Sequence, residues 1–480
     1  MTDVSYLAIA PEILLLVGAV AVLMVDVFAH PQPRVHGWIT AVTFLATAVA
    51  IGGQWHRIGI DGAGTSFGGT LSLHNLSVSA RTILLVVAVL GAATAWDMLV
   101  GLGRRMAEGL SLVMVSTAGF MLMGASADLV MVFVALEIGS IALYVLAGIV
   151  RTSRAGDEAA MKYFLLGAFA SAIFIYGGAL AYAGTGTTNI VEAGAAMSSY
   201  HVARPAVLLI GMALLVVGLG FKVTAAPFHA WAPDVYQGAP AGVVGFMAAA
   251  AKVGGFAALM NILIVGFDRY REAWADGLAV LAAVSVVFGT LLAIQQSDLR
   301  RMLAYSGVAH AGFILTGITA GLAGSGGVLF YLATYSVMLV GAFAVVTVVS
   351  GPATSGSSFD EYRGLGRRSP LLAGVLAVLM IAMSGMPLTT GFIGKFQVFS
   401  SAWARGYEWL VIVGLLSSVA ALFFYLRPLV LMYFRAADPA QDHPSPSGRM
   451  RLVLLFSAVA TVVFGVFPAP LLGWLTQAGG

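Results

Sequence analysis

The chain consists mainly of apolar runs about as long as a membrane-crossing helix, separated by short polar or Gly- and Pro-rich breaks. A hydrocarbon core ~30 Å thick requires ~20 apolar residues in a helix that crosses it. Cutting the sequence at the breaks predicts about fourteen membrane-spanning helices. They lie near 5–29, 36–56, 79–100, 109–125, 127–150, 159–183, 203–226, 239–266, 273–295, 299–320, 326–350, 370–403, 407–434 and 450–475. We therefore expect an all-α, multi-pass membrane protein with residues 1–480 in a single membrane domain.

The composition excludes several other classes of protein. Hydrophobic residues make up 60% of the chain and charged residues 9%, whereas soluble domains are about 25% charged. The absence of cysteine excludes disulfides, thiolate catalysis and cysteine-ligated iron–sulfur clusters on this chain. The first apolar run has no basic segment before it and carries Asp3 and Glu12. We expect it to be retained as a helix rather than cleaved as a signal peptide.

Three stretches between the predicted helices have a character of their own. The Gly-rich segment 57–75 and the segment 435–449 are expected to be non-helical. A short amphipathic piece at 188–200 is expected to lie on the surface. The fourth and fifth spans are separated only by residues 125–127, so their division is the least marked in the sequence.

The arginines in the loops predict the orientation, because inner loops of membrane proteins are enriched in basic residues. With the N-terminus outside, thirteen loop arginines lie inside and six outside. The inner ones are Arg34, Arg104, Arg105, Arg151, Arg154, Arg300, Arg301, Arg363, Arg367, Arg368, Arg435, Arg449 and Arg451. The outer ones are Arg57, Arg81, Arg204, Arg269, Arg271 and Arg405. This bias predicts an even number of spans with both termini on the outer face.

Lysine occurs only inside apolar segments, at Lys162, Lys222, Lys252 and Lys395. A charge at the middle of the bilayer costs roughly 2.5–3.5 kcal/mol on insertion scales. A buried lysine can release its proton near neutral pH, whereas an arginine stays charged. We therefore hypothesise that the lysines carry protons. For Lys162, four residues after Glu158, an exposed ion pair or a side chain that snorkels to the interface is an equal alternative.

Two predicted helices are interrupted in a similar way, the seventh by KVTAAPFHAWAP and the twelfth by SGMPLTTGFIGK. Broken helices in the repeated halves of a transporter often mark an ion path near the midplane. Pro227 and Pro387 lie 160 residues apart, which would suit a five-helix unit used twice. The corresponding divisions are 1–108 for three N-terminal helices, 109–266 and 273–434 for the two repeats, and 450–475 for a C-terminal helix.

Three further groups could join the lysines in a proton path. Glu137 lies about ten residues into the fifth span, and at ~8 Å it would stabilise a charged Lys222 by ~2 kcal/mol. The alternative is a carboxylate tied to a neighbouring hydroxyl or backbone group. His229 and His310 suit a proton relay near pH 7, although either could simply be hydrogen-bonded to a neighbouring helix. No second histidine or cysteine stands at a ligand spacing, so no metal site is predicted.

Other features of the sequence fit structural roles. Asp298 is placed as the N-cap of the tenth span, and Asp234 reads as a turn or interface residue. No Gly-rich phosphate loop follows a strand, so no nucleotide site and no catalytic residue are predicted on this chain. The net charge of +3 is spread over many loops, and no nucleic-acid partner is expected.

Taken together, three motifs resemble one family of membrane proteins. APFHAWAPDVYQGAP, followed by the apolar helix with Lys252, closely resembles subunit N of bacterial proton-translocating NADH:quinone oxidoreductase (respiratory complex I). LRRMLAYSGVAHAGF resembles the tenth-helix signature of the wider antiporter-like subunit family, and GMPLTTGFIGKF resembles its broken twelfth helix. That family also includes subunits L and M and the multisubunit cation/proton antiporters. The sequence PDVYQGAP and the lysine after the second break favour subunit N.

The resemblance implies a fourteen-helix proton channel with two inverted five-helix repeats in the membrane arm of complex I, in the bacterial cell membrane. It implies that Glu137 modulates Lys222, that Lys252 is the central relay and that Lys395 faces the exit. His229 and His310 would lie on the hydrated axis between them. NADH, FMN, iron–sulfur clusters and quinone would be bound by other subunits, with none on this chain. Other membrane-arm subunits and lipid would be its partners, and a cation/proton antiporter component is the alternative function.

Overall fold

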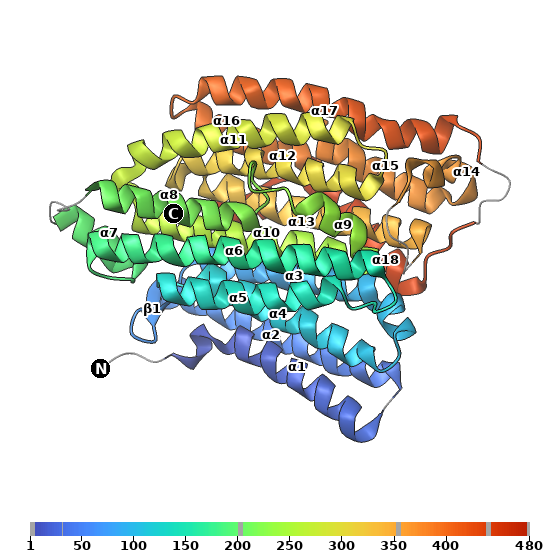
Figure 1. The fold of residues 1–480 in the computed structure, drawn as a ribbon, viewed down its shortest axis with the longest axis horizontal. Helices are drawn as coiled ribbons and strands as arrows, with labels where there is room; N and C mark the ends of the chain where they lie inside the picture. The colour runs from blue at the N-terminus through green and yellow to red at the C-terminus, as the bar shows by residue number, and fades with distance from the viewer. Residues whose placement is uncertain (1–4, 31, 200–204, 352–356, 438–442, 478–480) are drawn as a thin grey trace.

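The computed structural model describes residues 5–30, 32–199, 205–351, 357–437 and 443–477, and these are mostly helical (Figure 1). The α-helices of the first half are α1 (Ala10–Ala29), α2 (Pro33–Asp61), α3 (Asn75–Gly101), α4 (Arg105–Ala125), α5 (Leu129–Ala147), α6 (Arg154–Thr185), α7 (Ile190–Ser199), α8 (Pro205–Lys222), α9 (Ala232–Gly238) and α10 (Ala241–Met260). Those of the second half are α11 (Arg271–Ile294), α12 (Leu299–Thr319), α13 (Leu322–Ser350), α14 (Leu365–Arg368), α15 (Pro370–Ser384), α16 (Thr390–Trp403), α17 (Glu408–Phe434), α18 (Gly448–Val466) and α19 (Ala469–Gln477). The short elements are η1 (Tyr6–Ala8), the π-helix η2 (Asn261–Gly266), η3 (Asp268–Tyr270), η4 (Phe359–Tyr362), β1 (Gly64–Ser66) and β2 (Leu71–Leu73).

The predicted membrane fold is confirmed. Within the described ranges, thirteen helices are long and apolar enough to cross a membrane. The twelfth predicted span consists of the two shorter helices α15 and α16, and the predicted C-terminal span divides into α18 and α19. The fourth and fifth spans are separate helices, since α4 ends at Ala125 and Asp128 caps α5 by accepting hydrogen bonds from two backbone N–H groups.

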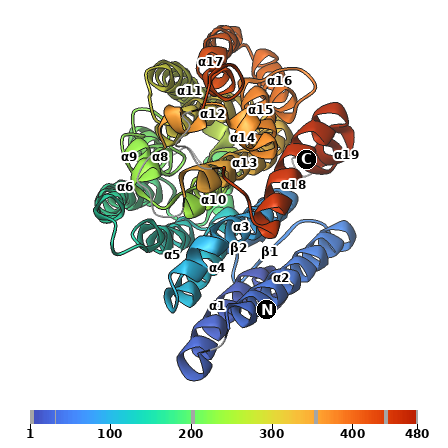
Figure 2. The same ribbon diagram turned by 90° about the vertical axis from the view of Figure 1, so that its right-hand side faces the viewer.

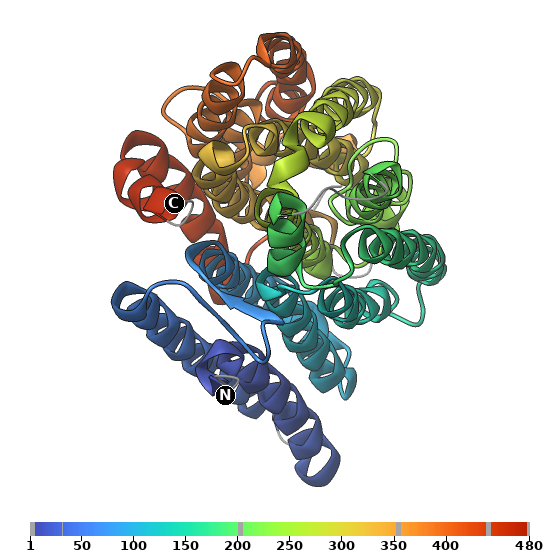
Figure 3. The same cartoon turned by 90° about the vertical axis from the view of Figure 1, so that its left-hand side faces the viewer.

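The helices form two groups, which are easiest to distinguish end-on. In Figure 2, α1 and α2 lie side by side along one edge and contact the rest of the chain through α3 and α4. The view from the opposite side in Figure 3 shows the same arrangement, with the remaining helices gathered into a larger bundle. In this bundle α10 packs against α3, α4 and α13, and α13 packs against α12 and α16.

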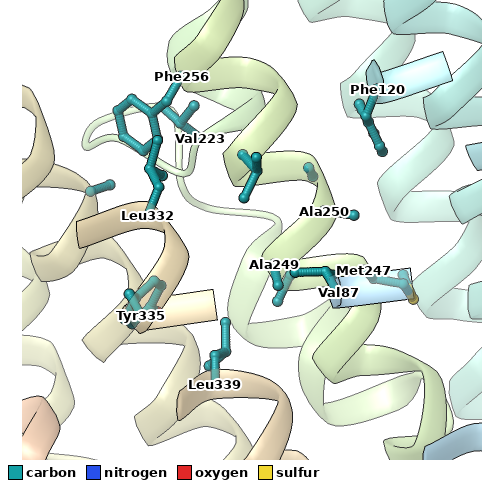
Figure 4. Close-up of a cluster of buried hydrophobic side chains, with 14 of the residues drawn as sticks. Val87, Phe120, Val223, Met247, Ala249, Ala250, Phe256, Leu332, Tyr335 and Leu339 are labelled. Atoms are coloured by element: carbon teal, nitrogen blue, oxygen red, sulfur yellow. The ribbon is translucent and has the colours of Figure 1, made fainter. Parts of the chain in front are cut away.

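The helix α10 lies at the centre of the bundle, and all of its residues are buried. Its alanines and glycines allow neighbouring helices to approach closely: a Cβ added to Gly254 would lie 2.8 Å from the Cβ of Phe120 in α4. Figure 4 shows Phe120 on one side of α10 and Leu332, Tyr335 and Leu339 of α13 on the other. A side chain in the middle of α10 is therefore enclosed by protein.

The segment 57–75 was expected to be non-helical, but it begins with helix and contains a small hairpin. α2 continues to Asp61, supported by an i,i+4 ion pair between Arg57 and Asp61 at 3.4 Å. It ends at Gly62, whose φ of +78° is readily adopted only by glycine. β1 and β2 then pair antiparallel, with Gly64 opposite Leu73.

Two other loop predictions have a mixed outcome. The piece at 188–200 forms α7, which packs against η2 through the buried side chains of Ile190, Ala193 and Met197. It therefore lies partly in the protein rather than simply on the surface, and residue 200 lies outside the described residues. In the segment 435–449, the described residues before α18 are non-helical, and residues 438–442 are not among those described.

Both predicted helix breaks are present. α8 ends at Lys222, and the chain passes through Thr224, with φ +61°, before α9 begins at residue 232. The second break separates α15 from α16 and contains Gly385 with φ +92° and Leu388 with φ +65°. Backbone groups freed by a broken helix need new partners inside a membrane. In the first break, Ser285 of α11 accepts a hydrogen bond from the backbone N–H of Ala226 at 2.9 Å.

A short backbone bridge occurs twice in the same form. Asp128 and Asp298 each cap the start of a helix, and each forms an antiparallel bridge, to Asn189 and Ser358 respectively. In both, the residue after the aspartate donates its N–H to the carbonyl of the residue before the bridge partner, at 2.9 and 2.8 Å. The predicted N-cap role of Asp298 is thus observed.

Close packing of α4 on α5 gives a stability prediction. A Cβ added to Gly119 would lie 2.3 Å from the backbone nitrogen of Gly139, so neither helix could accommodate it without moving. We expect Gly119→Ala to destabilise the protein by ~1–3 kcal/mol, the usual cost of overpacking. The measurement is the thermal unfolding midpoint of the detergent-solubilised protein. Gly277→Ala on α11 is the control, because no atom lies within 4 Å of its added Cβ; equal midpoints for the two variants would contradict the packing argument.

Candidate functional site

Three of the four lysines are almost fully buried. Lys222, Lys252 and Lys395 are 2%, 1% and 5% exposed, whereas the side chain of Lys162 is 41% exposed. The buried three come from the end of α8, the middle of α10 and the first turns of α16. The two breaks therefore place one lysine before the first interruption and one after the second, with Lys252 on the central helix.

Lys222 lies in a cage of aromatic rings. Its Nζ is 5.9 Å from the ring centroid of Phe120, 5.3 Å from that of Tyr144 and 5.1 Å from that of Tyr163. Trp231, from the break itself, stacks on Tyr163 with centroids 4.3 Å apart. The faces of the rings attract the ammonium, but Nζ has no hydrogen-bond partner among the described residues. The stability of the charged ammonium therefore depends on other charged groups near the cage.

Glu137 is tied to a neighbouring hydroxyl. The Oγ of Ser171 in α6 donates a short hydrogen bond to its Oε1, and the side chain of Glu137 is half-buried. It forms no ion pair with Lys222 within the part of the chain described. Glu137 is thus bonded to a neighbouring hydroxyl, which is what the alternative interpretation of this residue predicted. Any effect on Lys222 has to act through space, from the same helix that carries Tyr144 two turns further on.

Thr224, in the first break, is the hydrogen-bond partner of Lys252. The Nζ of Lys252 donates a hydrogen bond of 2.6 Å to Thr224 Oγ1. Thr224 follows Lys222 by two residues, and its φ of +61° turns the chain back toward α10. On its other side Lys252 faces Gly307 of α12: an added Cβ there would lie 3.4 Å from Lys252 Nζ and 3.2 Å from the hydroxyl of Tyr335. The missing side chain of Gly307 leaves space between an ammonium and a phenol.

His310 is surrounded by tyrosines. Its Nδ1 is hydrogen-bonded to the hydroxyl of Tyr331 and its Nε2 to that of Tyr425, both at 2.9 Å. The ring of Tyr335 stacks on it with centroids 4.3 Å apart, and Tyr425 also shares a short hydrogen bond with Ser306. Both ring nitrogens therefore have partners that can donate or accept a proton. His310 lies one helical turn beyond the position where Lys252 faces α12.

Lys395 is held by the second break. Its Nζ donates hydrogen bonds to the carbonyl of Ser384 at 2.8 Å and to Ser418 Oγ at 3.2 Å. It also lies 4.6 Å from the ring centroid of Phe313, which is on α12 one turn after His310. Ser384 is the last residue of α15, where carbonyls lack helical partners. The broken helix thus supplies an acceptor for the buried ammonium.

His229 and Lys162 form no hydrogen bond or ion pair with the three buried lysines within the described residues. His229 is half-buried, and its only ring neighbour among the described residues is Tyr305, with centroids 6.0 Å apart. Among the described residues it has no hydrogen bond, ion pair or ring contact with Lys252 or His310. The predicted grouping is supported for His310 by its contacts and not for His229.

Lys162 takes part in an exposed ion-pair network. Its Nζ lies 2.7 Å from carboxylate oxygens of both Glu158 and Asp234, and Asp234 also pairs with Arg301 at 2.7 Å. Burial raises the pKa of Asp234, but the hydrogen bonds from Lys162 and Arg301 outweigh it and hold that pKa below its ordinary value. Lys162, Glu158 and Asp234 line a polar pocket of about 230 Å³ beside α9. Lys162 is therefore an exposed lysine with an i,i+4 partner, as the alternative interpretation of the sequence predicted.

Several members of the site were not identified from the sequence. They are the cage residues Phe120, Tyr144 and Tyr163, the linking residue Thr224, and the tyrosines around His310, Tyr331, Tyr335 and Tyr425. The chain has 15 tyrosines, and only the packing of helices distinguishes these from the others. The sequence offered one indication of these tyrosines: a hydroxyl group inside an otherwise apolar span needs a hydrogen-bond partner.

Comparisons with known proteins agree on one family. A family model described as "NADH:quinone oxidoreductase/Mrp antiporter, TM" matches residues 126–421. The NADH-quinone oxidoreductase subunit N of Trichlorobacter lovleyi is 38% identical over 475 residues, covering 98% of this chain and 96% of the relative. The chain belongs to the family of NADH-quinone oxidoreductase subunit N. A second member, from Mycobacterium tuberculosis, is 45% identical over 386 residues, covering 78% of this chain and 72% of the relative.

Solved structures extend the family likeness to three dimensions. A chain of respiratory complex I from Thermus thermophilus with bound aureothin superimposes with a TM-score of 0.81 at 32% identity, covering 96% of this chain and 98% of the other. A chain of an archaeal membrane-bound sulfane sulfur reductase gives 0.86 at 25% identity, with coverage of 99% and 97%. A chain of the Mrp complex of a Dietzia species gives 0.84 at 21% identity, covering 99% of this chain and 97% of the other, and that likeness shows the fold alone.

Proposed function

We propose that this chain translocates protons as a membrane-arm subunit of NADH:quinone oxidoreductase. The observation that most strongly supports the proposal is the series of buried groups that begins at Lys222 and continues through Thr224, Lys252 and His310 to Lys395. Three enclosed lysines that have no carboxylate partner among the described residues are expensive in a membrane. Groups of this kind usually mark ion paths, and family membership supplies the redox complex that would drive this one.

The proposed path has three steps. Lys222 gains or loses its proton as the charge of Glu137 is brought closer or moved away, because aromatic faces alone hold the ammonium weakly. Thr224 then connects Lys222 to Lys252, whose proton passes across the space at Gly307 toward the tyrosines and His310. Ordered water fills the gaps between polar groups, as is usual for buried polar sites. Lys395, held at the second break, is the last group.

Redox chemistry is assigned to other subunits. The complex to which the family belongs is an oxidoreductase. We propose that NADH, FMN, iron–sulfur clusters and quinone bind elsewhere in it and that this chain is a non-redox, proton-translocating subunit. Cysteine ligation of a cluster is excluded here because the sequence has no cysteine.

The orientation and the internal repeat are part of the proposal. The bias of loop arginines supports both termini on the outer face of the bacterial cell membrane. The matched bridges at Asp128 and Asp298 support repeats over 109–266 and 273–434, following an N-terminal unit of 1–108 and preceding the C-terminal helix within 450–475.

Copurification separates this function from that of a cation/proton antiporter. We expect the tagged chain, extracted from its native membrane in mild detergent, to copurify with NADH:quinone reductase activity. Reconstituted vesicles should acidify or alkalinise only when NADH and quinone are supplied. Exchange of sodium or potassium for protons without NADH, in a preparation that lacks the reductase activity, would contradict the proposal and favour the antiporter.

In the proposed path, Tyr425 is a hydrogen-bond partner of His310. Its hydroxyl is hydrogen-bonded to both His310 and Ser306, so Tyr425→Phe removes a partner of the histidine without changing the shape of the ring. Losing such a bond costs ~1 kcal/mol, and we expect a roughly fivefold slower proton uptake at unchanged assembly. Proton uptake rate in sealed vesicles is the measurement, with Tyr433→Phe on the exposed face of α17 as the matched control. Equal rates for the two variants would remove Tyr425 from the path.

A further inference from the structure

A cleft of about 400 Å³ lies between α2 and the main bundle. The helices that line it are not those that carry the buried lysines. It is lined by Arg34, Gly37, Trp38, Thr40, Ala41 and Phe44 of α2, by Ala92, Ala93 and Trp96 of α3, and by Leu110 of α4 and Arg449 of α18. Most of this lining is apolar. α3 packs against both α2 and α18, and Figure 2 shows these helices in the same part of the molecule.

One end of the cleft carries two arginines that form no ion pair with any described residue. Neither Arg34 nor Arg449 makes an ion pair within the residues that the structure describes, and both side chains are exposed. The guanidinium of Arg449 lies over the ring of Trp96, 4.4 Å from its centroid. Asp97, next to Trp96 in the sequence, accepts a hydrogen bond from Ser447 at 2.6 Å, and Asp26 lies 3.1 Å from His36. Two positive charges thus remain available at the mouth of an apolar cleft.

The ends of the helices place these arginines at a membrane boundary. Arg34 lies in the first turn of α2 and Arg449 in the first turn of α18, while Trp96 is near the end of α3 and Leu110 near the start of α4. Tryptophans at Trp38 and Trp96 are typical of the headgroup region. The apolar part of the cleft then extends from that boundary toward the middle of the bilayer.

We propose that this cleft binds an anionic phospholipid, with its phosphate between Arg34 and Arg449 and an acyl chain along Phe44, Ala93 and Leu110. Guanidinium groups recognise phosphate through paired, charge-assisted hydrogen bonds. Basic pockets between membrane helices are a known form of lipid headgroup site. The volume lies within the usual range of small-ligand sites, about 300–1,000 Å³.

The charge of the cleft favours a lipid over a helix of a neighbouring subunit. A protein segment would have to supply acidic groups to both arginines, whereas a single phosphate can meet both. An acyl chain is flexible and fills a narrow apolar channel without leaving polar groups unpaired.

Lipid binding to the intact complex tests the proposal. The complex is delipidated in detergent and titrated with phosphatidylglycerol, phosphatidylcholine or inorganic phosphate, and bound lipid is counted by native mass spectrometry. We expect phosphatidylglycerol to bind, phosphatidylcholine to bind more weakly, and phosphate alone at millimolar concentration not to displace it. Replacing both arginines, R34Q with R449Q, should weaken binding by about 25-fold, or fivefold for each charge. R367Q on α14, an exposed arginine outside the cleft, should leave binding unchanged.

A second variant separates the acyl chain from the headgroup. Ala93→Leu fills the apolar part of the cleft and keeps both arginines, and we expect it to lower phosphatidylglycerol binding by tenfold or more. A photo-crosslinking amino acid at Trp38 then identifies the occupant in native membranes, and a lipid adduct is expected. An adduct to another subunit, or equal lipid binding by the wild type and the double-arginine variant, would overturn the proposal. These measurements do not use NADH, so their failure leaves the proposed proton path untouched.

Discussion

Lys252→Met is expected to stop proton translocation through this chain while leaving the complex assembled. Methionine fills a similar volume without a charge, and Lys252 is surrounded by the small residues of α10 that keep the helices in place. Among the described residues its one hydrogen bond is to Thr224 at 2.6 Å, and in the proposed path this bond links Lys252 to Lys222 across the first break. Removing the group breaks the series in its middle. NADH-driven proton uptake by sealed vesicles is the measurement, with complex content checked by native electrophoresis.

Lys252→Arg distinguishes proton transfer from simple charge stabilisation. Arginine preserves the positive charge and can still donate to Thr224, but it does not release its proton at physiological pH. We expect Lys252→Arg to be as inactive in pumping as Lys252→Met. Recovery of wild-type proton uptake by the arginine variant would mean that a fixed charge is sufficient at this position, and Lys252 would not be a proton carrier.

Gly307→Val is expected to slow pumping by tenfold or more without altering any titratable group. A Cβ added at this position would lie 3.2 Å from the hydroxyl of Tyr335 and 3.4 Å from Lys252 Nζ. Valine would add two methyl groups beyond that Cβ. Those methyls would occupy the space through which the proton leaves Lys252 in the proposed path. A tenfold reduction corresponds to ~1.4 kcal/mol added to the barrier, well within the effect of excluding a bridging water. Proton uptake rate in vesicles measures it.

The control for Gly307→Val is the same substitution at Gly374 of α15, where no atom lies within 4 Å of an added Cβ. Overpacking also costs ~1–3 kcal/mol of stability, so the unfolding midpoint is recorded for both variants. A folded, assembled Gly307→Val complex that pumps at the wild-type rate would show that the proton does not pass between Lys252 and Tyr335.

The sequence was sufficient to predict the helices and the breaks. Apolar length determines a membrane span directly, since the bilayer fixes how many residues are needed. Pro227 and Pro387 indicated where the seventh and twelfth spans are interrupted, and both interruptions are present. The rarity of lysine identified Lys222, Lys252 and Lys395, which are the three that the structure buries.

The neighbours of those lysines could not be predicted from the sequence. α10 and α13 are apolar around most of their circumference, so hydrophobic periodicity does not show which side faces which helix. Tyr425 and His310 are more than one hundred residues apart, and only packing of α17 on α12 brings them into contact. For Lys162 the sequence left two alternatives, and its exposure and its pairing with Asp234 distinguish them. The matched bridges at Asp128 and Asp298, which support the proposed repeat, could not be predicted from the sequence either.

The proton-to-electron ratio in sealed vesicles, measured for each lysine replaced by glutamine, tests the central claim most directly. The claim is that the buried lysines, and not lysines in general, carry protons. The account predicts a clear fall in the ratio for Lys222→Gln, Lys252→Gln and Lys395→Gln, with NADH oxidation and assembly measured in the same preparations. It predicts a much smaller change for Lys162→Gln, whose side chain is exposed and ion-paired. A wild-type ratio in assembled complexes carrying the three buried substitutions would contradict the account.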